Sequence, residues 1–173
     1  MKQLNFLLLF LIAINIKAQA VKHQALNCKI LVDINYEGNI NVYDNTGKIV
    51  KKLKNNIKKE DFISLTIIGT NDSMYNVIAN QAFEGVIAKG WIKKNNPHIG
   101  IYVRNYDSPL SLYQKPEEKS KIQSTIKHYY PILFHFKDCE NNWLYIYIVI
   151  ANKKFEGWLS PDMQCANSYT TCN

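Results

Sequence analysis

The sequence predicts an all-β protein that contains two copies of one small module. Short runs of β-branched and aromatic residues recur along the chain, and turn-forming residues separate them. No long stretch repeats its apolar residues at the 3.6-residue period of a helix. Several short motifs also return in the same order about 70 residues later. A duplicated β module accounts for all three observations.

The N-terminus has the pattern of a secretory signal peptide. Lys2 supplies a basic start, residues 6–14 are an unbroken apolar run, and Ala18-Gln19-Ala20 is a small-x-small cleavage pattern. We therefore expect residues 1–20 to be removed and the protein to be secreted or periplasmic. No later run approaches the roughly 18 apolar residues of a membrane-spanning helix, so we expect no membrane span.

Composition and charge exclude several classes of protein. With 47% apolar and 20% charged residues among 173, the chain is neither collagen-like nor of low complexity. Two of the 21 basic residues and none of the 14 acidic ones fall within residues 1–20, which leaves an excess of five positive charges. Six lysines within residues 48–59 form the main basic run, and no aromatic residue interrupts it. We expect a solvated loop there and no nucleic-acid partner.

Four cysteines follow the apolar run: Cys28, Cys139, Cys165 and Cys172. An even number in an exported chain predicts two disulfides, and four cysteines allow three pairings. Cys165 with Cys172 would close a short terminal loop, and Cys28 with Cys139 would then cross-link the two halves. A bond from Cys139 to either terminal cysteine is equally allowed by the sequence. No cluster of metal-ligand residues occurs, so we expect neither a metal nor another cofactor.

The expected strands of the first copy follow one another closely. They are residues 28–35, 40–43, 48–50, 62–68 and 74–79. Residues 51–61 are expected to be a polar connection. Alternation places Ile63, Leu65 and Ile67 on one buried face.

The second copy repeats several of these segments. Residues 40–43 correspond to 110–113, and 62–68 correspond to 132–136. The letters VIAN and FEG of residues 77–85 return in residues 149–157, and Gly90-Trp91 returns as Gly157-Trp158. The polar segment 93–97 separates the copies, and residues 117–126 are compatible with one helical turn. The predicted organisation is a first domain over 21–97, a second over 98–165 and a tail over 166–173.

The second copy resembles the bacterial SH3-like (SH3b) domain. The resemblance is carried by residues 110–116 and 119–122, by Trp143-Leu144-Tyr145-Ile146, and by Gly157-Trp158-Leu159-Ser160. The first copy departs further, with Tyr75 where the mid-domain tryptophan is expected. The resemblance implies a small, strongly bent β-barrel of five to seven strands per copy. It also implies association with cell-envelope polymers or partner proteins.

The strand that begins at Trp143 suggests a binding surface. Alternation assigns Leu144, Ile146 and Ile148 to the core and places Trp143, Tyr145 and Tyr147 on the opposite face. This aromatic row is either exposed or covered by the first copy. Exposed aromatic rows stack on sugar rings or hold extended peptides. The candidate ligand-binding residues are Tyr113, Trp143, Tyr145, Tyr147 and Trp158, although we expect Trp158 mainly to pack.

The sequence therefore predicts a non-catalytic binding protein. It contains no GxSxG, HExxH or phosphate-binding glycine loop. The expected function is binding of cell-envelope glycan or peptide through the aromatic row. The alternative is a protein–protein adaptor or inhibitor in the periplasm or extracellular space. A hydrolase with a Cys–His pair would need a free thiol, which two disulfides would remove.

Overall fold

The computed structural model describes residues 26–166. The predicted signal peptide (1–20), Cys172 and all but the first residue of the predicted tail lie outside this range. Within it, the elements longer than three residues are all β-strands, so the all-β prediction is confirmed. No helix of the described residues is long and apolar enough to cross a membrane.

The first half forms six strands and a short 3-10 turn. These are β1 (Cys28–Val32), β2 (Ile40–Tyr43), β3 (Ile49–Leu53), η1 (Ile57–Lys59), β4 (Ile63–Thr70), β5 (Met74–Gln81) and β6 (Gly85–Lys93). The five strands expected from sequence are present, and β6 completes the set. The expected polar connection over 51–61 is wrong at its start, because residues 51–53 pair with β2 as part of β3.

The second half forms seven strands and a second 3-10 turn in the described part of the chain. These are β7 (Ile99–Val103), β8 (Leu110–Tyr113), β9 (Ile122–Ile126), β10 (Phe134–Glu140), β11 (Trp143–Ile150), β12 (Lys153–Leu159), η2 (Pro161–Met163) and β13 (Gln164–Cys165). The helical turn considered for 117–126 is absent, because residues 122–126 pair with β8 as a strand.

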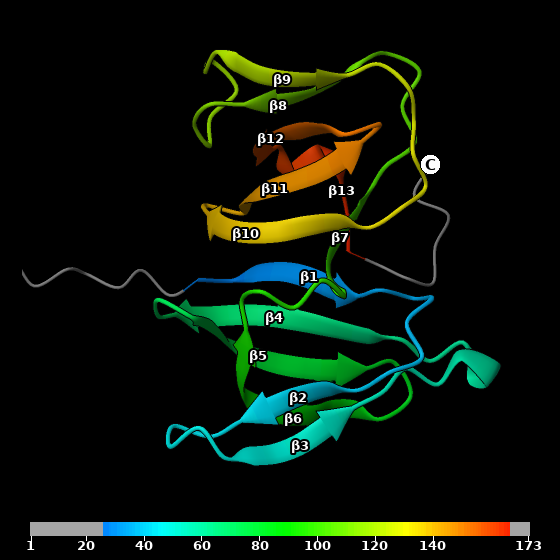
Figure 1. Ribbon diagram of the computed structural model, residues 1–173, viewed down its shortest axis with the longest axis vertical. Helices are drawn as coiled ribbons and strands as arrows, with labels where there is room; N and C mark the ends of the chain where they lie inside the picture. The colour runs from blue at the N-terminus through cyan, green and yellow to red at the C-terminus, as the bar shows by residue number, and fades with distance from the viewer. Residues whose placement is uncertain (1–25, 167–173) are drawn as a thin grey trace, which may run out of the picture.

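The two halves have the same strand order. Read outward from the centre, the first half runs β1, β4, β5, β6, β2, β3, and the second runs β7, β10, β11, β12, β8, β9 (Figure 1). Every ladder is antiparallel, and together they form one large sheet that is not closed. The correspondence of each strand with its partner six positions later supports the duplication inferred from sequence. We refer below to residues 28–93 as the first repeat and to residues 99–165 as the second repeat.

Pairing registers match in detail between the repeats. Tyr43 lies opposite Trp91, and Tyr113 lies opposite Trp158. Gly90 and Gly157, which precede the two tryptophans, have φ values of 154° and 150°. A Cβ atom on Gly90 would lie 2.7 Å from the Tyr43 carbonyl oxygen, and one on Gly157 would lie 2.9 Å from that of Tyr113. The Gly-Trp motif thus marks the point where the last long strand of each repeat passes close to another backbone.

The structure corrects two residue correspondences made from sequence. The VIAN letters of residues 77–80 lie inside β5, whereas those of residues 149–152 end β11 and form its turn. Asn76 pairs with Trp91 as Tyr145 pairs with Trp158, so β5 and β11 correspond at a shift of 69 rather than 72. Tyr75 therefore takes the buried place of Leu144, and Met74 takes that of Trp143.

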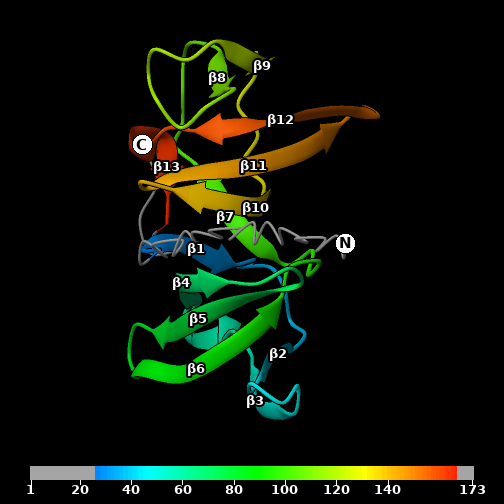
Figure 2. The same cartoon turned by 90° about the vertical axis from the view of Figure 1, so that its left-hand side faces the viewer.

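The repeats meet at β1 and β7, which lie between the two halves in both views (Figures 1 and 2). Leu31 pairs with Gly100 across this junction, and β7 also pairs with β10 and β13. The Tyr75 hydroxyl donates to the Lys137 carbonyl oxygen at 2.7 Å, and the Tyr102 hydroxyl donates to Asp33 at 3.0 Å. Backbone ladders and side-chain bonds therefore both cross from one repeat to the other.

A disulfide joins the repeats. Cys28 on β1 is bonded to Cys139 on β10, with their Cα atoms 6.3 Å apart. Of the pairings that the sequence left open, the structure contains the one that cross-links the two halves, and it excludes the pairings of Cys139 with a terminal cysteine. Cys165 is also disulfide-bonded. Since the Cys28–Cys139 bond closes a long loop, it restricts the unfolded chain strongly and stabilises the fold.

Candidate binding surface

The five predicted ligand-binding residues lie on three neighbouring strands of the second repeat. We call this set the aromatic surface: Tyr113 on β8, Trp143, Tyr145 and Tyr147 on β11, and Trp158 on β12. The predicted inward face of β11 is confirmed, since Leu144, Ile146 and Ile148 are all buried. Burial of these aliphatic residues fixes the orientation of β11, which turns its tyrosines away from the core.

Four of the five aromatic side chains form two ring pairs on neighbouring strands, which together we call the cluster. Trp158 lies opposite Tyr113 on one side and opposite Tyr145 on the other. The rings of Tyr145 and Trp158 are 5.4 Å apart and meet edge to face, as do those of Tyr113 and Trp143 at 5.5 Å. Edge-to-face packing of this kind contributes about 0.5–1.5 kcal/mol per pair beyond the burial of area. The cluster is therefore held in a defined shape without a ligand.

Exposure differs among the five residues. Trp143 is only 7% exposed, so it supports the cluster from beneath and offers a ligand little of its own surface. Tyr113, Tyr145, Tyr147 and Trp158 are half-buried. Each ring contact of these residues in the described part of the chain is with a residue of the second repeat. The first repeat nevertheless approaches one end of the row, because burial, then Asp138 and then Tyr147 raise the pKa of Tyr75 on β5.

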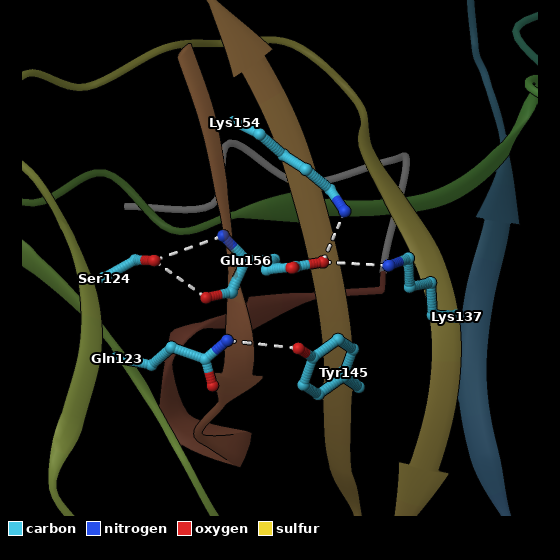
Figure 3. A network of polar contacts seen from close by, with 6 residues as sticks. All are labelled: Gln123, Ser124, Lys137, Tyr145, Lys154 and Glu156. Atoms are coloured by element: carbon cyan, nitrogen blue, oxygen red, sulfur yellow. Dashed lines mark hydrogen bonds and ion pairs between the residues drawn. The ribbon is translucent and has the colours of Figure 1, made fainter.

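Two lysines and a glutamate extend the aromatic surface around Tyr147. The Lys137 and Lys154 ammonium groups lie 2.8 Å and 2.7 Å from the same Glu156 carboxylate oxygen (Figure 3). Both ammonium groups also lie over the Tyr147 ring, at 5.1 Å and 5.4 Å from its centre. Two positive charges meet one negative charge, so this end of the surface is net positive.

The ion pairs shift the protonation equilibria of this group. Hydrogen bonds from Lys137 and then Lys154 hold the pKa of the Glu156 carboxyl below its ordinary value. The bond to Glu156 in turn raises the pKa of Lys154. Because Glu156 stays ionised to a lower pH than usual, the pair of lysines remains anchored through the mildly acidic range. Both lysines are exposed and Glu156 is half-buried, so solvent screens the ion pairs and their contribution to stability is small.

Strand β9 holds the surface from its other side. Ser124 donates a hydrogen bond to the Glu156 carbonyl oxygen at 2.8 Å and accepts one from its backbone N–H at 3.2 Å (Figure 3). Gln123 donates to the Tyr145 hydroxyl at 3.2 Å. These contacts bridge 32 and 22 residues of chain. They fix Tyr145 and the backbone of Glu156 relative to β9.

Sequence reasoning did not find the lysines, Glu156 or the β9 residues. Part of the signal was available, because alternation along β12 puts Lys154, Glu156 and Trp158 on one face. Lys137 gave no such signal. It lies at a β-bulge between Phe136 and Asp138, where two-residue periodicity is interrupted.

The arrangement offers features that binding sites use. Partly exposed aromatic faces beside two ammonium groups can stack on a sugar ring or hold a peptide, and can pair with a negative group. Cys28 and Cys139 are bonded to each other and therefore supply no thiol nucleophile. In residues 26–166 no three His, Cys, Asp or Glu side chains converge as metal ligands would.

Comparison with known proteins adds no family assignment. No family model matches the chain, and no curated protein matches it. The resemblance to SH3-like domains therefore rests on the residues of this chain alone.

Proposed function

We propose that the chain is an exported, non-catalytic binding protein of two tandem SH3-like units, and that the second unit engages cell-envelope glycan or peptide. The observation that carries the proposal is the partly exposed Tyr145–Trp158 pair beside the positive charges of Lys137 and Lys154. Aromatic faces provide stacking area at low cost in side-chain entropy, and the lysines favour acidic polymers.

The strand arrangement supports SH3-like units. In the second repeat, β7 is followed by the β8–β9 hairpin and the β10–β12 meander. The 3-10 turn η2 then leads to β13, which returns to pair with β7. In the first repeat, the chain leaving β6 returns as β7 and pairs with β1. The second repeat thus ends beside the strand with which it began, and in the first repeat β7 takes the place beside β1; such a return is what a small bent barrel requires.

Export is supported by the covalent chemistry of the fold. The Cys28–Cys139 bond and the disulfide-bonded Cys165 require an oxidising compartment to persist. The signal-peptide pattern of residues 1–20 gives a route to that compartment. A secreted or periplasmic protein with a basic surface meets acidic wall polymers directly.

An adaptor or inhibitor that holds a partner protein is the second candidate. Among the described strands, β3 ends the sheet and pairs with β2 alone. Its residues Ile49 and Val50 are 42% and 53% exposed. An extended partner segment can add to such an edge through backbone hydrogen bonds. The lysines of β3 also oppose unspecific strand addition, so this candidate ranks second.

The proposal is tested by retention of the oxidised full chain on purified peptidoglycan. We expect wild-type protein to be retained above a heat-denatured control. Tyr145→Ala should bind about tenfold more weakly, which corresponds to roughly 1.4 kcal/mol. Lys137→Gln should bind more weakly as well, and its affinity should depend less on salt because one charge contact is lost.

Phe83→Ala is the matched control, because Phe83 is an aromatic residue of the first repeat that is 74% exposed. Its removal should leave retention unchanged. Equal retention of folded and denatured protein would refute the glycan proposal. Capture of one stoichiometric protein from a periplasmic extract, without retention on peptidoglycan, would favour the adaptor.

A further inference from the structure

The first repeat contains a groove that lies apart from the aromatic surface. It runs between β2 and the segment that connects β6 to β7 and has a volume of about 330 Å³. This volume falls in the usual range of small-ligand sites. The side chains on which the argument rests are Tyr36, Asn39, Tyr43, Lys93, Asn95 and His98.

The second repeat has a groove at the corresponding place. Tyr106 and Tyr113 line it, each 70 residues after Tyr36 and Tyr43, and its volume is about 570 Å³. In both repeats the other side of the groove is the segment that follows the Gly-Trp strand, which is the strand with the Gly-Trp motif: β6 in the first repeat and β12 in the second. A groove that recurs at equivalent positions is a feature of the module rather than an accident of one loop.

Stacked rings give the first groove a rigid side. Tyr36 and His98 lie almost parallel, with ring centres 3.6 Å apart and 10° between their planes. The His98 backbone is held at both ends, since its N–H donates to Asn96 Oδ1 at 2.9 Å and its carbonyl accepts from Asp33 at 2.9 Å. The groove is therefore formed before any ligand arrives, which lowers the entropic cost of binding.

Three exposed polar side chains of the groove make no hydrogen bond or ion pair with the described protein. Among the residues that the structure describes, the side-chain amides of Asn39 and Asn95 make no hydrogen bond. Lys93 has no carboxylate within ion-pair distance in residues 26–166, and its ammonium group lies 5.6 Å from the centre of the Tyr43 ring. Amide groups that both donate and accept, next to one cation, are thus available to a ligand.

The two grooves differ in charge. The first is lined by Lys93 and by no acidic residue. The second is lined by Asp107 and Asp162 and by no lysine or arginine. The first groove therefore favours an anionic ligand and the second disfavours one, although each is lined by two tyrosines at equivalent positions.

We propose that the first-repeat groove binds a carbohydrate that carries a carboxylate, such as a uronic acid. Sugar hydroxyls both donate and accept hydrogen bonds, as the asparagine amides do, and Lys93 pairs with the carboxylate. The sugar then lies against Tyr43 on the side of β2. This site is independent of the aromatic surface, so either can fail without the other.

The test is calorimetric titration of the oxidised full chain with a uronic-acid trisaccharide. We expect binding at least tenfold tighter than that of the matching neutral trisaccharide. Lys93→Gln should weaken binding of the acidic sugar about tenfold, and Asn39→Ala should weaken it severalfold. Lys89→Gln, on the same strand but outside the groove, is the matched control and should bind as wild type does.

Tyr145→Ala separates this site from the proposed function, because it alters the aromatic surface and should leave uronate binding unchanged. Equal affinity for the acidic and neutral sugars would overturn the proposal, as would full binding by Lys93→Gln. A glutamate-rich peptide that bound as tightly as the acidic sugar would overturn the assignment to carbohydrate.

Discussion

Asn55 shows at the scale of one residue how the first repeat is held together. Its side chain is buried at 4% exposure and bridges two segments. The amide donates to the Asp33 carbonyl oxygen at 2.8 Å, and its oxygen accepts from the Ile63 backbone N–H at 3.0 Å. Since buried backbone groups must be paired, Asn55 is the partner that lets β4 begin beside the end of β1.

We predict that Asn55→Ala lowers the free energy of unfolding by about 2–3 kcal/mol, because it leaves a buried N–H and a carbonyl without partners. Urea denaturation followed by tryptophan fluorescence measures the change. Asn35→Ala, at an exposed position, should stay within about 0.5 kcal/mol of wild type. A similarly small effect at Asn55 would show that water replaces its bonds.

The site residues were only partly predictable for reasons visible at this scale. Alternation along β11 identified Tyr145 and Tyr147 correctly as outward-facing, because period-two geometry is local. It did not reveal that Trp143 is covered by Tyr113, which lies 30 residues earlier in the chain. Lys137 meets Glu156 only through the pairing of β10, β11 and β12, which no local pattern encodes.

At the scale of the elements, the Gly-Trp strand is the feature that each repeat depends on. Gly157 pairs with Ile146 on β11, while a Cβ on Gly157 would approach the Tyr113 carbonyl oxygen to 2.9 Å and Leu112 Cβ to 3.0 Å. β12 can therefore pass between β11 and β8 only where the side chain is absent. The next residue, Trp158, is then positioned between Tyr113 and Tyr145.

Gly157→Ala is predicted to destabilise the protein by about 2 kcal/mol or more, because the new methyl group meets backbone and requires an unfavourable φ. It should also weaken binding by the aromatic surface, since Trp158 moves with the strand. Chemical denaturation and peptidoglycan retention are the two readouts. Gly69→Ala is the control, as its Cβ would make an ordinary 3.5 Å contact with Asn76. Wild-type stability of the Gly157 variant would contradict this view of the Gly-Trp strand.

The sequence predicted the strands themselves better than it predicted which residue of the first repeat corresponds to which residue of the second. The strands of the first half were found because each is a short apolar run between turn residues. The VIAN letters misled the alignment because identical letters occupy a strand interior at Val77 and a strand end at Val149. The two repeats share the strand register around Trp91 and Trp158. Register depends on which residues pair across strands, and identical residue types in two segments do not reveal it.

At the scale of the molecule, the repeats are joined strand to strand rather than by a flexible linker. The predicted boundary at residue 97 lies in the turn before β7, yet β7 pairs with β1 of the first repeat as well as with β10 and β13. The disulfide from Cys28 to Cys139 reinforces this junction. The sequence indicated two copies and disulfides but left the pairing of the cysteines open. It also gave no sign of the ladder between β1 and β7, because pairing between distant strands leaves no local pattern. The aromatic surface and the first-repeat groove are thereby presented on one connected framework.

Amide hydrogen exchange of the oxidised full chain, with and without solubilised peptidoglycan fragments, tests the central claim most directly. The amides of β1 and β7 should be among the slowest in both states, because each strand is paired across the junction. Ligand should slow exchange in β8, β11 and β12 around Tyr113, Tyr145 and Trp158. Protection confined to the edge strands β3 or β9, or no ligand-dependent change at saturating fragment, would contradict the account.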